Sequence, residues 1–173
     1  MTVDKHDHDQ TYDGGCTCGF VRYRLNRPPF IVHGCHCTWC QRQSGGAFAI
    51  NALIEATEVE MLHGQFENTM VPSPSGEGQQ IARCPKCKVA VWSNYNYSGL
   101  FERVRFIRVG TLDEANLLPP DVHIFTTERQ TWFDFPEGAL VVDDFYNTQE
   151  VFSKESMRRV MKLVDEMNAE EGG

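Results

Sequence analysis

The sequence predicts a mainly β fold of antiparallel sheets that ends in one α-helix. From Cys18 onward, apolar residues alternate with polar ones in short runs, which is the period of a half-buried strand. The runs follow one another too closely for the long crossovers that parallel pairing requires. A clear helical period occurs only near the C-terminus.

Gly, Pro, Asn and Asp, which favour turns, separate the expected strands. In the first strand, Val21, Tyr23 and Leu25 alternate with two arginines, and the second follows a Gly-Gly break. The expected strands are residues 21–25, 48–54, 59–62, 80–83, 89–93, 101–112, 122–126 and 140–142. Residues 72–78, with the sequence PSPSGEG, have the composition of a surface loop.

The C-terminal helix is expected to begin after Ser153, whose side chain is placed to cap the first turn. Its apolar residues recur at three- and four-residue steps and predict a face that packs on the sheets, formed by Met157, Val160, Met161, Val164 and Met167. Residues 1–13 are polar and charged and predict a disordered or frayed tail. Residues 14–173 are therefore expected to form a single domain.

Length and charge exclude several classes of protein. The 173 residues fit one domain, and 41% hydrophobic content excludes a wholly disordered chain. The net charge of -8 argues against a nucleic-acid partner. No apolar stretch approaches the roughly 18 residues of a membrane span, and the first residues lack the apolar core of a signal peptide. We therefore expect a cytoplasmic protein with no membrane or nucleic-acid partner.

Seven cysteines gather in three groups, which are Cys16-Thr-Cys18, Cys35-His-Cys37-Thr-Trp-Cys40 and Cys84-Pro-Lys-Cys87. Because cytosolic thiols stay reduced, clustered cysteines indicate metal ligands rather than disulfides. Two thiolates of a C-x-x-C turn can reach one tetrahedral zinc ion at about 2.3 Å. The sequence therefore predicts a zinc-binding domain.

Two divisions of the cysteines are open. A single zinc ribbon built from the two C-x-x-C pairs would leave three cysteines spare. A division into four plus three leaves none spare and gives a closed structural site and a site with an open position. Spacing alone does not show which pair joins Cys16 and Cys18, although Cys35, Cys37 and Cys40 can supply three ligands from one loop. This economy favours two zinc ions.

Residues 14–23 (GGCTCGFVRY), 35–48 (CHCTWCQRQSGGAF) and 84–87 (CPKC) carry a resemblance to a known family. In order and spacing they are similar to the glutathione-dependent formaldehyde-activating enzymes, also called the centromere protein V family. Weaker similarity at residues 109–113 and 123–132 extends the resemblance over residues 12–135. One departure is Lys88, where the family usually has glycine; it fits if the turn avoids positive φ, or at a modest strain cost.

The resemblance implies a β-tent-type fold around a structural zinc, and a second, catalytic zinc. The implied ligands are Cys16, Cys18, Cys84 and Cys87 for the structural ion and Cys35, Cys37 and Cys40 for the catalytic ion. The implied reaction joins formaldehyde to glutathione as S-hydroxymethylglutathione, or cleaves that adduct as a carbon-sulfur lyase. Two Zn2+ ions per chain, a small thiol such as glutathione and a small aldehyde are therefore expected.

Three thiolates on Zn2+ leave one net negative charge, so this ion is a weaker Lewis acid than one held by three histidines. An incoming thiol that binds in the open position loses its proton more easily, because coordination stabilises the thiolate. We expect that sulfur, or a ligand sulfur, to add to an aldehyde carbon, and the reverse reaction to break the same bond.

Candidate substrate contacts follow the second cysteine group and lie on later strands. Gln43 and Ser44 are expected to form hydrogen bonds, Phe48 to form an apolar wall, and His123 and Trp132 to contribute from later strands. Each has a simpler alternative. Ser44 can serve the adjacent glycine turn, His123 can be an interior histidine, and Phe48 and Trp132 fit the core better.

Their positions in the sequence also give expectations for one histidine and three arginines. His36 is expected to point away from the ion that its neighbours bind. The arginines at 103, 105 and 108 form a basic patch that can receive substrate carboxylates, although a solvated strand edge is the preferred interpretation.

Two other functions compete with a zinc carbon-sulfur lyase. One is a non-catalytic zinc scaffold that binds a partner, which the complete C-H-C-x-x-C motif argues against. The other is a thioredoxin-like role for Cys37 and Cys40, which needs a strand-to-helix setting and leaves Cys35 without a purpose. The sequence therefore predicts an enzyme that forms or cleaves a thiol-aldehyde adduct.

Overall fold

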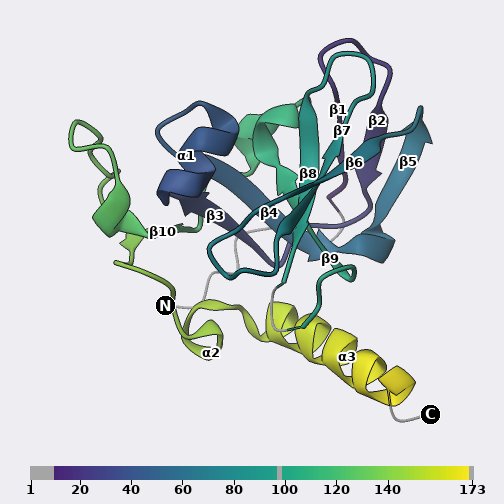
Figure 1. The fold of residues 1–173 in the computed structure, drawn as a ribbon. Coiled ribbons are helices and arrows are strands. Elements are labelled where there is room, and N and C mark those ends of the chain that lie inside the picture. The colour runs from purple at the N-terminus through teal and green to yellow at the C-terminus, as the bar shows by residue number, and fades with distance from the viewer. Residues whose placement is uncertain (1–9, 97–98, 172–173) are drawn as a thin grey trace.

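The computed structural model describes residues 10–96 and 99–171, which form two β-sheets and three α-helices. The smaller sheet has the strand order β1-β2-β5 and is antiparallel throughout (Figure 1). Its strands are β1 (Tyr12–Gly15), β2 (Arg22–Leu25) and β5 (Val59–His63). The prediction of a mainly β fold with a C-terminal helix is confirmed.

The larger sheet has eight strands in the order β11-β10-β3-β4-β9-β8-β7-β6. Its strands are β3 (Ile31–Cys35), β4 (Ala49–Glu55), β6 (Glu67–Val71), β7 (Gln79–Arg83), β8 (Ala90–Tyr95), β9 (Val104–Arg108), β10 (Val122–Ile124) and β11 (Leu140–Val141). Pairing is antiparallel from β3 to β6, whereas β10 pairs parallel with both β3 and β11. The parallel pairs differ from the expectation because long loops, rather than hairpin turns, lead into and out of β10.

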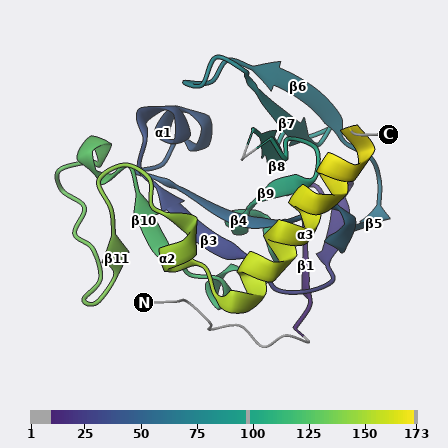
Figure 2. The same ribbon diagram turned by 90° about the horizontal axis from the view of Figure 1, so that it is seen from below.

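The three helices are α1 (Thr38–Ser44), α2 (Thr148–Val151) and α3 (Lys154–Glu171). The predicted cap of α3 is present, since the amide of Ser156 donates to Oγ of Ser153 at 3.0 Å. Figure 2 shows α3 crossing beneath the larger sheet. The predicted apolar face is wrong at Met161, which is 50% exposed, and lacks Leu163, which is buried.

A buried ion pair fastens α3 to β4. Nε of Arg159 donates to Oε1 of Glu55 at 2.7 Å, its Nη2 reaches the other carboxylate oxygen, and both side chains are less than 10% exposed. The guanidinium also lies over the ring of Phe30, 4.5 Å from the centroid. The pair joins α3 to Glu55, the last residue of β4.

The core consists of two apolar clusters. One joins the two sheets and contains Tyr23 and Trp92, whose rings meet edge-to-face at 5.5 Å. The other joins the larger sheet to α2 and α3 and contains Leu53, Val104 and Leu163. The larger sheet is therefore covered in part on both faces.

Several elements differ from the prediction. The strand β1 begins at Tyr12, inside the range predicted as a tail, and Tyr12 is only 6% exposed; residues 1–9 of that range lie outside the described residues. The strand predicted for residues 101–112 is shorter, because a turn after Leu100 precedes β9 and a 3-10 turn (Val109–Thr111) follows it. The strands β3 and β6 and the helices α1 and α2 were not predicted.

No helix in the part of the chain that the structure describes is both long enough and apolar enough to cross a membrane.

Candidate metal centres

The structure brings the seven cysteines together as a group of four and a group of three. The sulfur atoms within each group lie within 4.8 Å of one another, so each group can hold a metal ion. The two C-x-x-C pairs belong to different groups, so the single zinc ribbon is not formed. The four-cysteine group is Cys16, Cys18, Cys84 and Cys87, and the three-cysteine group is Cys35, Cys37 and Cys40.

Two loops supply the four-cysteine group. Cys16 and Cys18 lie between β1 and β2, and Cys84 and Cys87 lie between β7 and β8. The sulfur of Cys18 is 3.5 Å from that of Cys16 and 3.7 Å from that of Cys84. Four thiolates at about 2.3 Å from one zinc ion are separated by about 3.8 Å, so the group fits a tetrahedral ion. A metal here would join the two sheets.

Backbone amides stabilise negative charge on these sulfurs. The amide of Val21 donates to the sulfur of Cys16 at 3.2 Å. Amide hydrogen bonds from Val89 and Cys18 lower the pKa of Cys87 to about 6. Thiolates are the form that binds zinc, so these contacts prepare the group for a metal.

Lys88 closes the second loop in the left-handed region, with φ of 63°. Its amide donates to the carbonyl of Cys84 at 2.9 Å, and its ammonium group forms a 2.7 Å ion pair with Glu67. The turn therefore does not avoid positive φ, and Lys88 takes the place of glycine at a strain cost. This conformation costs a non-glycine residue about 1 kcal/mol.

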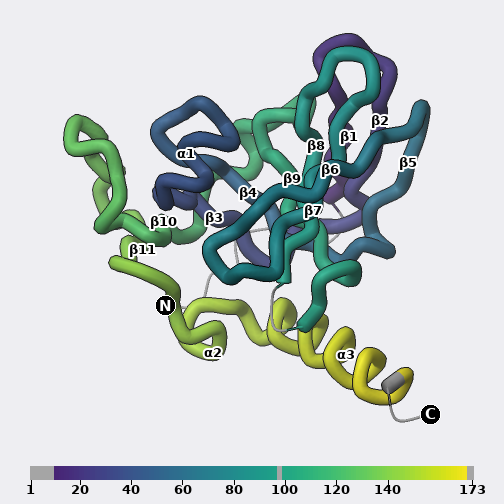
Figure 3. Tube along the Cα trace, viewed as in Figure 1, coloured from purple at the N-terminus to yellow at the C-terminus, as the bar shows by residue number. Residues whose placement is uncertain are grey.

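The three-cysteine group lies where β3 ends and α1 begins, and Figure 3 shows this stretch of the chain as a tube. Cys35 is the last residue of β3, and Cys37 is the N-cap of α1. The sulfur of Cys37 accepts a hydrogen bond from the amide of Cys40 at 3.3 Å. The sulfurs of Cys35 and Cys37 are 3.5 Å apart. Gly45 ends the helix with φ of 69°, a conformation that suits glycine.

Charge at this group concentrates on one sulfur. Hydrogen bonds from the thiols of Cys35 and Cys40, with amide donors of the first helical turn, lower the pKa of Cys37 to about 3. Cys35 is buried, whereas Cys37 and Cys40 are half-buried. Three sulfurs at this spacing can hold a zinc ion and leave one tetrahedral position free of these ligands.

The junction of β3 and α1 also supplies the strand-to-helix setting that a redox cysteine pair needs. The third cysteine is not spare, however, because Cys35 lies within the same group. The three cysteines therefore form one group that could hold a metal ion.

A family comparison agrees with this grouping. Residues 11–128, which include all seven cysteines, match the model of the family described as "Glutathione-dependent formaldehyde-activating enzyme". The chain belongs to this family. A curated protein of Halomonas elongata, named "Putative glutathione-dependent formaldehyde-activating enzyme", is 31% identical over 129 residues, which are 70% of this chain and 79% of that protein.

Among solved structures, a crystal structure of a Rhodobacter sphaeroides protein is similar to 58% of this chain and 87% of its own. The sequence identity is 17% and the TM-score is 0.42.

In this member of the glutathione-dependent formaldehyde-activating enzyme family, His36 points away from the cysteine sulfurs, as expected. Its Nε2 lies 2.9 Å from Nδ1 of His123 and its ring stacks on Phe48 at 4.7 Å. Phe133 and Phe135 complete an aromatic cluster around it. Burial lowers the pKa of His36 to about 4 and also lowers that of His123, so both rings are neutral near pH 7.

The partners of His36 lie on the opposite face of the sheet from the Cys35 side chain. In the register, His123 faces Gly34 while Ile124 faces Cys35, and adjacent residues of a strand point to opposite faces. Phe48 and His123 therefore gather around His36 rather than beside the cysteine sulfurs. Substrate contact by either residue stays a prediction.

The remaining candidates lie near the surface. Ser44 donates to the carbonyl of Cys40 at 2.8 Å and accepts from the amide of Gly46, so it closes the turn after α1. Gln43 is half-buried. Trp132 does not lie on a strand and is 71% exposed, so its expected place in the core is wrong.

Gln41 was not predicted and ties α1 to the loop after β10. Its Nε2 donates to the carbonyls of His36 and Glu128, at 2.6 and 2.9 Å. The side chain of Glu128 in turn accepts from the amide of Thr38 at 2.7 Å. No periodicity marks these contacts, because they join loops distant in sequence.

The three arginines do not form one patch. Arg103 precedes β9 and pairs with Glu170, and Arg105 stacks on Trp92 at 4.6 Å from the ring centroid. Arg108 lies three residues further along β9, on the opposite face from Arg105, and donates to Asn51. The expected basic edge is therefore divided between two faces.

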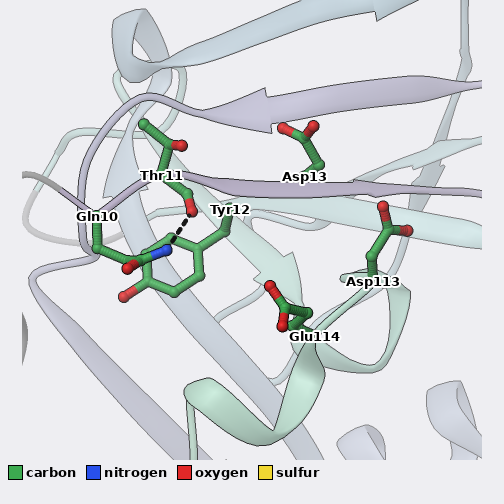
Figure 4. A pocket seen from close by; sticks show the side chains of 6 residues that line it. All are labelled: Gln10, Thr11, Tyr12, Asp13, Asp113 and Glu114. Carbon is green, nitrogen blue, oxygen red and sulfur yellow. Dashed lines mark hydrogen bonds between the residues drawn. The ribbon is translucent and has the colours of Figure 1, made fainter.

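A polar cavity next to β1 has none of the seven cysteines in its lining (Figure 4). It is lined by Gln10, Thr11, Tyr12, Asp13, Asp113 and Glu114. Two of its carboxylates are neutralised, since Asp13 pairs with Arg24 and Asp113 with Arg22.

Proposed function

We propose that the chain is a zinc-dependent enzyme that forms or cleaves the bond between a thiol sulfur and an aldehyde carbon. The family description supports glutathione and formaldehyde as the substrates. The proposed adduct is S-hydroxymethylglutathione, and the enzyme that forms or cleaves it would be a carbon-sulfur lyase. The observation that carries the proposal is the three-cysteine group, whose geometry accepts a metal and leaves a fourth position for a thiol.

The two groups have different proposed roles. The four cysteines between the sheets hold a structural zinc, and Cys35, Cys37 and Cys40 hold the catalytic one. When bound, the catalytic ion supplies a positive centre that stabilises a thiolate. The chain fixes that centre with one buried sulfur and two half-buried ones, and the amide of Cys40 stabilises the charge on Cys37.

The other side chains assist in two ways in this proposal. Gln43 and Ser44, on the last turn of α1, are the proposed substrate contacts. Phe48 and His123 pack on His36 and so position the loop between Cys35 and Cys37. Seven cysteines without a disulfide support a reduced, cytoplasmic location. The net charge of -8 supports small-molecule partners over nucleic acid.

The test combines metal analysis with exchange kinetics. Formaldehyde and glutathione combine unaided, so catalysis is measured as faster exchange between free and adduct formaldehyde at equilibrium, by NMR exchange spectroscopy. The native protein should contain two zinc ions and accelerate exchange, whereas Cys35→Ser should stay folded, keep one zinc ion and lose the acceleration. Cys84→Ser is the matched control and should unfold, because structural zinc contributes on the order of 10 kcal/mol.

Other outcomes assign other functions. Two zinc ions without acceleration would indicate a scaffold. One zinc ion, with a reversible disulfide between Cys37 and Cys40, would indicate redox chemistry. Either result would overturn the proposed lyase.

A further inference from the structure

A polar row crosses three strands next to the three-cysteine group. His33 on β3 faces Asn51 on β4, and Asn51 faces Arg108 on β9. Cys35 lies two residues beyond His33, and register partners share a face of the sheet. Arg108 therefore projects from the face that carries the Cys35 side chain.

Asn51 holds the guanidinium in place. Its Oδ1 accepts a 2.5 Å hydrogen bond from Nη1 of Arg108, and Asn51 is only 5% exposed. A guanidinium has five N–H donors, so this bond leaves donors for another acceptor.

Arg108 has no carboxylate partner among the residues that the structure describes. Six other arginines in the same residues form ion pairs, namely Arg22, Arg24, Arg27, Arg103, Arg158 and Arg159. A half-buried guanidinium without a carboxylate partner can form a charge-assisted hydrogen bond with an anion that arrives with a ligand.

The charge of Arg108 acts on the cysteines themselves. Burial lowers the pKa of the guanidinium, and the sulfurs of Cys40, Cys35 and Cys37 act in the opposite direction. Arg83 adds a second positive charge near Arg108. Arg108 therefore places a positive charge close to the three cysteine sulfurs, with a second arginine near it.

We propose that Arg108 binds an anionic group of the ligand at the three-cysteine group, so that the site selects thiols that carry a carboxylate. Asn51 is a positioning residue for this contact. The inference rests on the proposed function for the identity of the ligand as a thiol, and on the geometry of β3, β4 and β9 for its charge.

The first test needs no catalysis and no bound substrate. Iodoacetate and iodoacetamide have nearly the same size and alkylate the same sulfurs, but only iodoacetate is an anion. The purified protein is treated with each reagent, and the rate at Cys37 is followed by peptide mass spectrometry. The iodoacetate-to-iodoacetamide rate ratio should be at least about threefold lower in Arg108→Gln than in the native protein.

Matched variants separate charge from structure. Arg108→Lys keeps the charge and should retain most of the ratio. Arg103→Gln makes the same change in net charge, but Arg103 precedes the first residue of β9 whereas Arg108 is the last, and this variant should leave the ratio unchanged. Asn51→Ala should lower the ratio by an intermediate amount.

The second test uses a pair of thiols. Cobalt-loaded protein is titrated with mercaptoacetate and with neutral mercaptoacetamide, and binding is read from the cobalt-thiolate absorption. The preference for mercaptoacetate should fall about tenfold in Arg108→Gln.

The outcomes distinguish this inference from the proposed lyase. Equal alkylation ratios in native and Arg108→Gln protein would overturn the role of Arg108, even if the native protein accelerates adduct exchange. A shifted ratio without any acceleration of exchange would support an anion-selective site and overturn the lyase. If Arg108→Gln does not fold, the Arg108→Lys and Asn51→Ala ratios decide.

Discussion

The imidazole of His123 lies so close over Gly34 that no side chain fits between them. A β-carbon added to Gly34 would be 2.6 Å from Nδ1 of His123 and 3.3 Å from Cβ of Pro120. The two residues are register partners on β3 and β10, directly before Cys35 and Ile124. Gly34 therefore lets His123 reach His36 beneath the three-cysteine group.

Gly34→Ala should destabilise the protein by about 1 to 3 kcal/mol, because the methyl group must displace the His123 ring. Urea unfolding measures the change. Gly110→Ala is the matched control, since an added β-carbon there meets nothing within 4 Å, and it should be close to neutral. Equal effects of the two substitutions would contradict the contact.

His123→Asn should lower the free energy of unfolding near neutral pH by about 1 kcal/mol, through loss of ring packing and of the His36 hydrogen bond. Burial lowers the pKa of His123 below 6.5 in the folded state, so its neutral form stabilises the fold above that pH. As the pH falls below 6.5, the unfolded chain takes up the proton first, and this stability is lost.

The gap between native protein and His123→Asn should therefore narrow as the pH falls from about 7.5 to about 5.5, since Asn does not titrate. Urea unfolding of both proteins across this range is the measurement. A gap that stays constant would sink the assignment of His123 as a buried neutral histidine.

Lys88→Gly should stabilise the protein relative to Lys88→Ala by about 1 kcal/mol, because alanine keeps the strain of positive φ and glycine relieves it. Both variants lose the exposed ion pair with Glu67, so that contribution cancels in the comparison. Thermal unfolding of the zinc-loaded variants reports the difference. A more stable alanine variant would show that the loop closes differently.

Arg159→Met should cost about 3 kcal/mol or more, because it leaves the buried carboxylate of Glu55 unpaired beneath α3. The double variant Glu55→Gln/Arg159→Met removes both charges and should recover part of that loss. Chemical denaturation of the single and double variants completes the cycle. Simple additivity of the two substitutions would refute a direct interaction.

The grouping of the cysteines could be predicted because a division into four and three leaves no cysteine spare, and the family resemblance implied which cysteines belong to each group. The strand at residues 21–25 could also be predicted, because one of its faces is buried and its side chains alternate. All five residues of β3 are buried, so Ile31–Cys35 shows no alternation of apolar and polar residues and was not predicted as a strand. The helix α1 has seven residues and none is buried, which leaves no apolar period to detect.

Long-range contacts account for the other differences. Gln41 and Asn51 owe their roles to partners far away in the sequence, and no local pattern identifies them. The expectation of one basic patch could have been rejected from the sequence, because Arg105 and Arg108 are three positions apart and a strand places residues an odd number of positions apart on opposite faces.

The two cysteine groups differ in how far apart along the chain their ligands lie, and this sets the order in which they can capture metal. Cys18 and Cys84 are 66 residues apart and meet only when the two sheets have assembled. Residues 35–40 bring three sulfurs to one short segment that an unfolded or nascent chain already presents. A metal that binds these three cysteines could therefore enter before the chain folds. Because the unfolded chain would also bind it there, that ion would add less to stability than an ion held by the four-cysteine group.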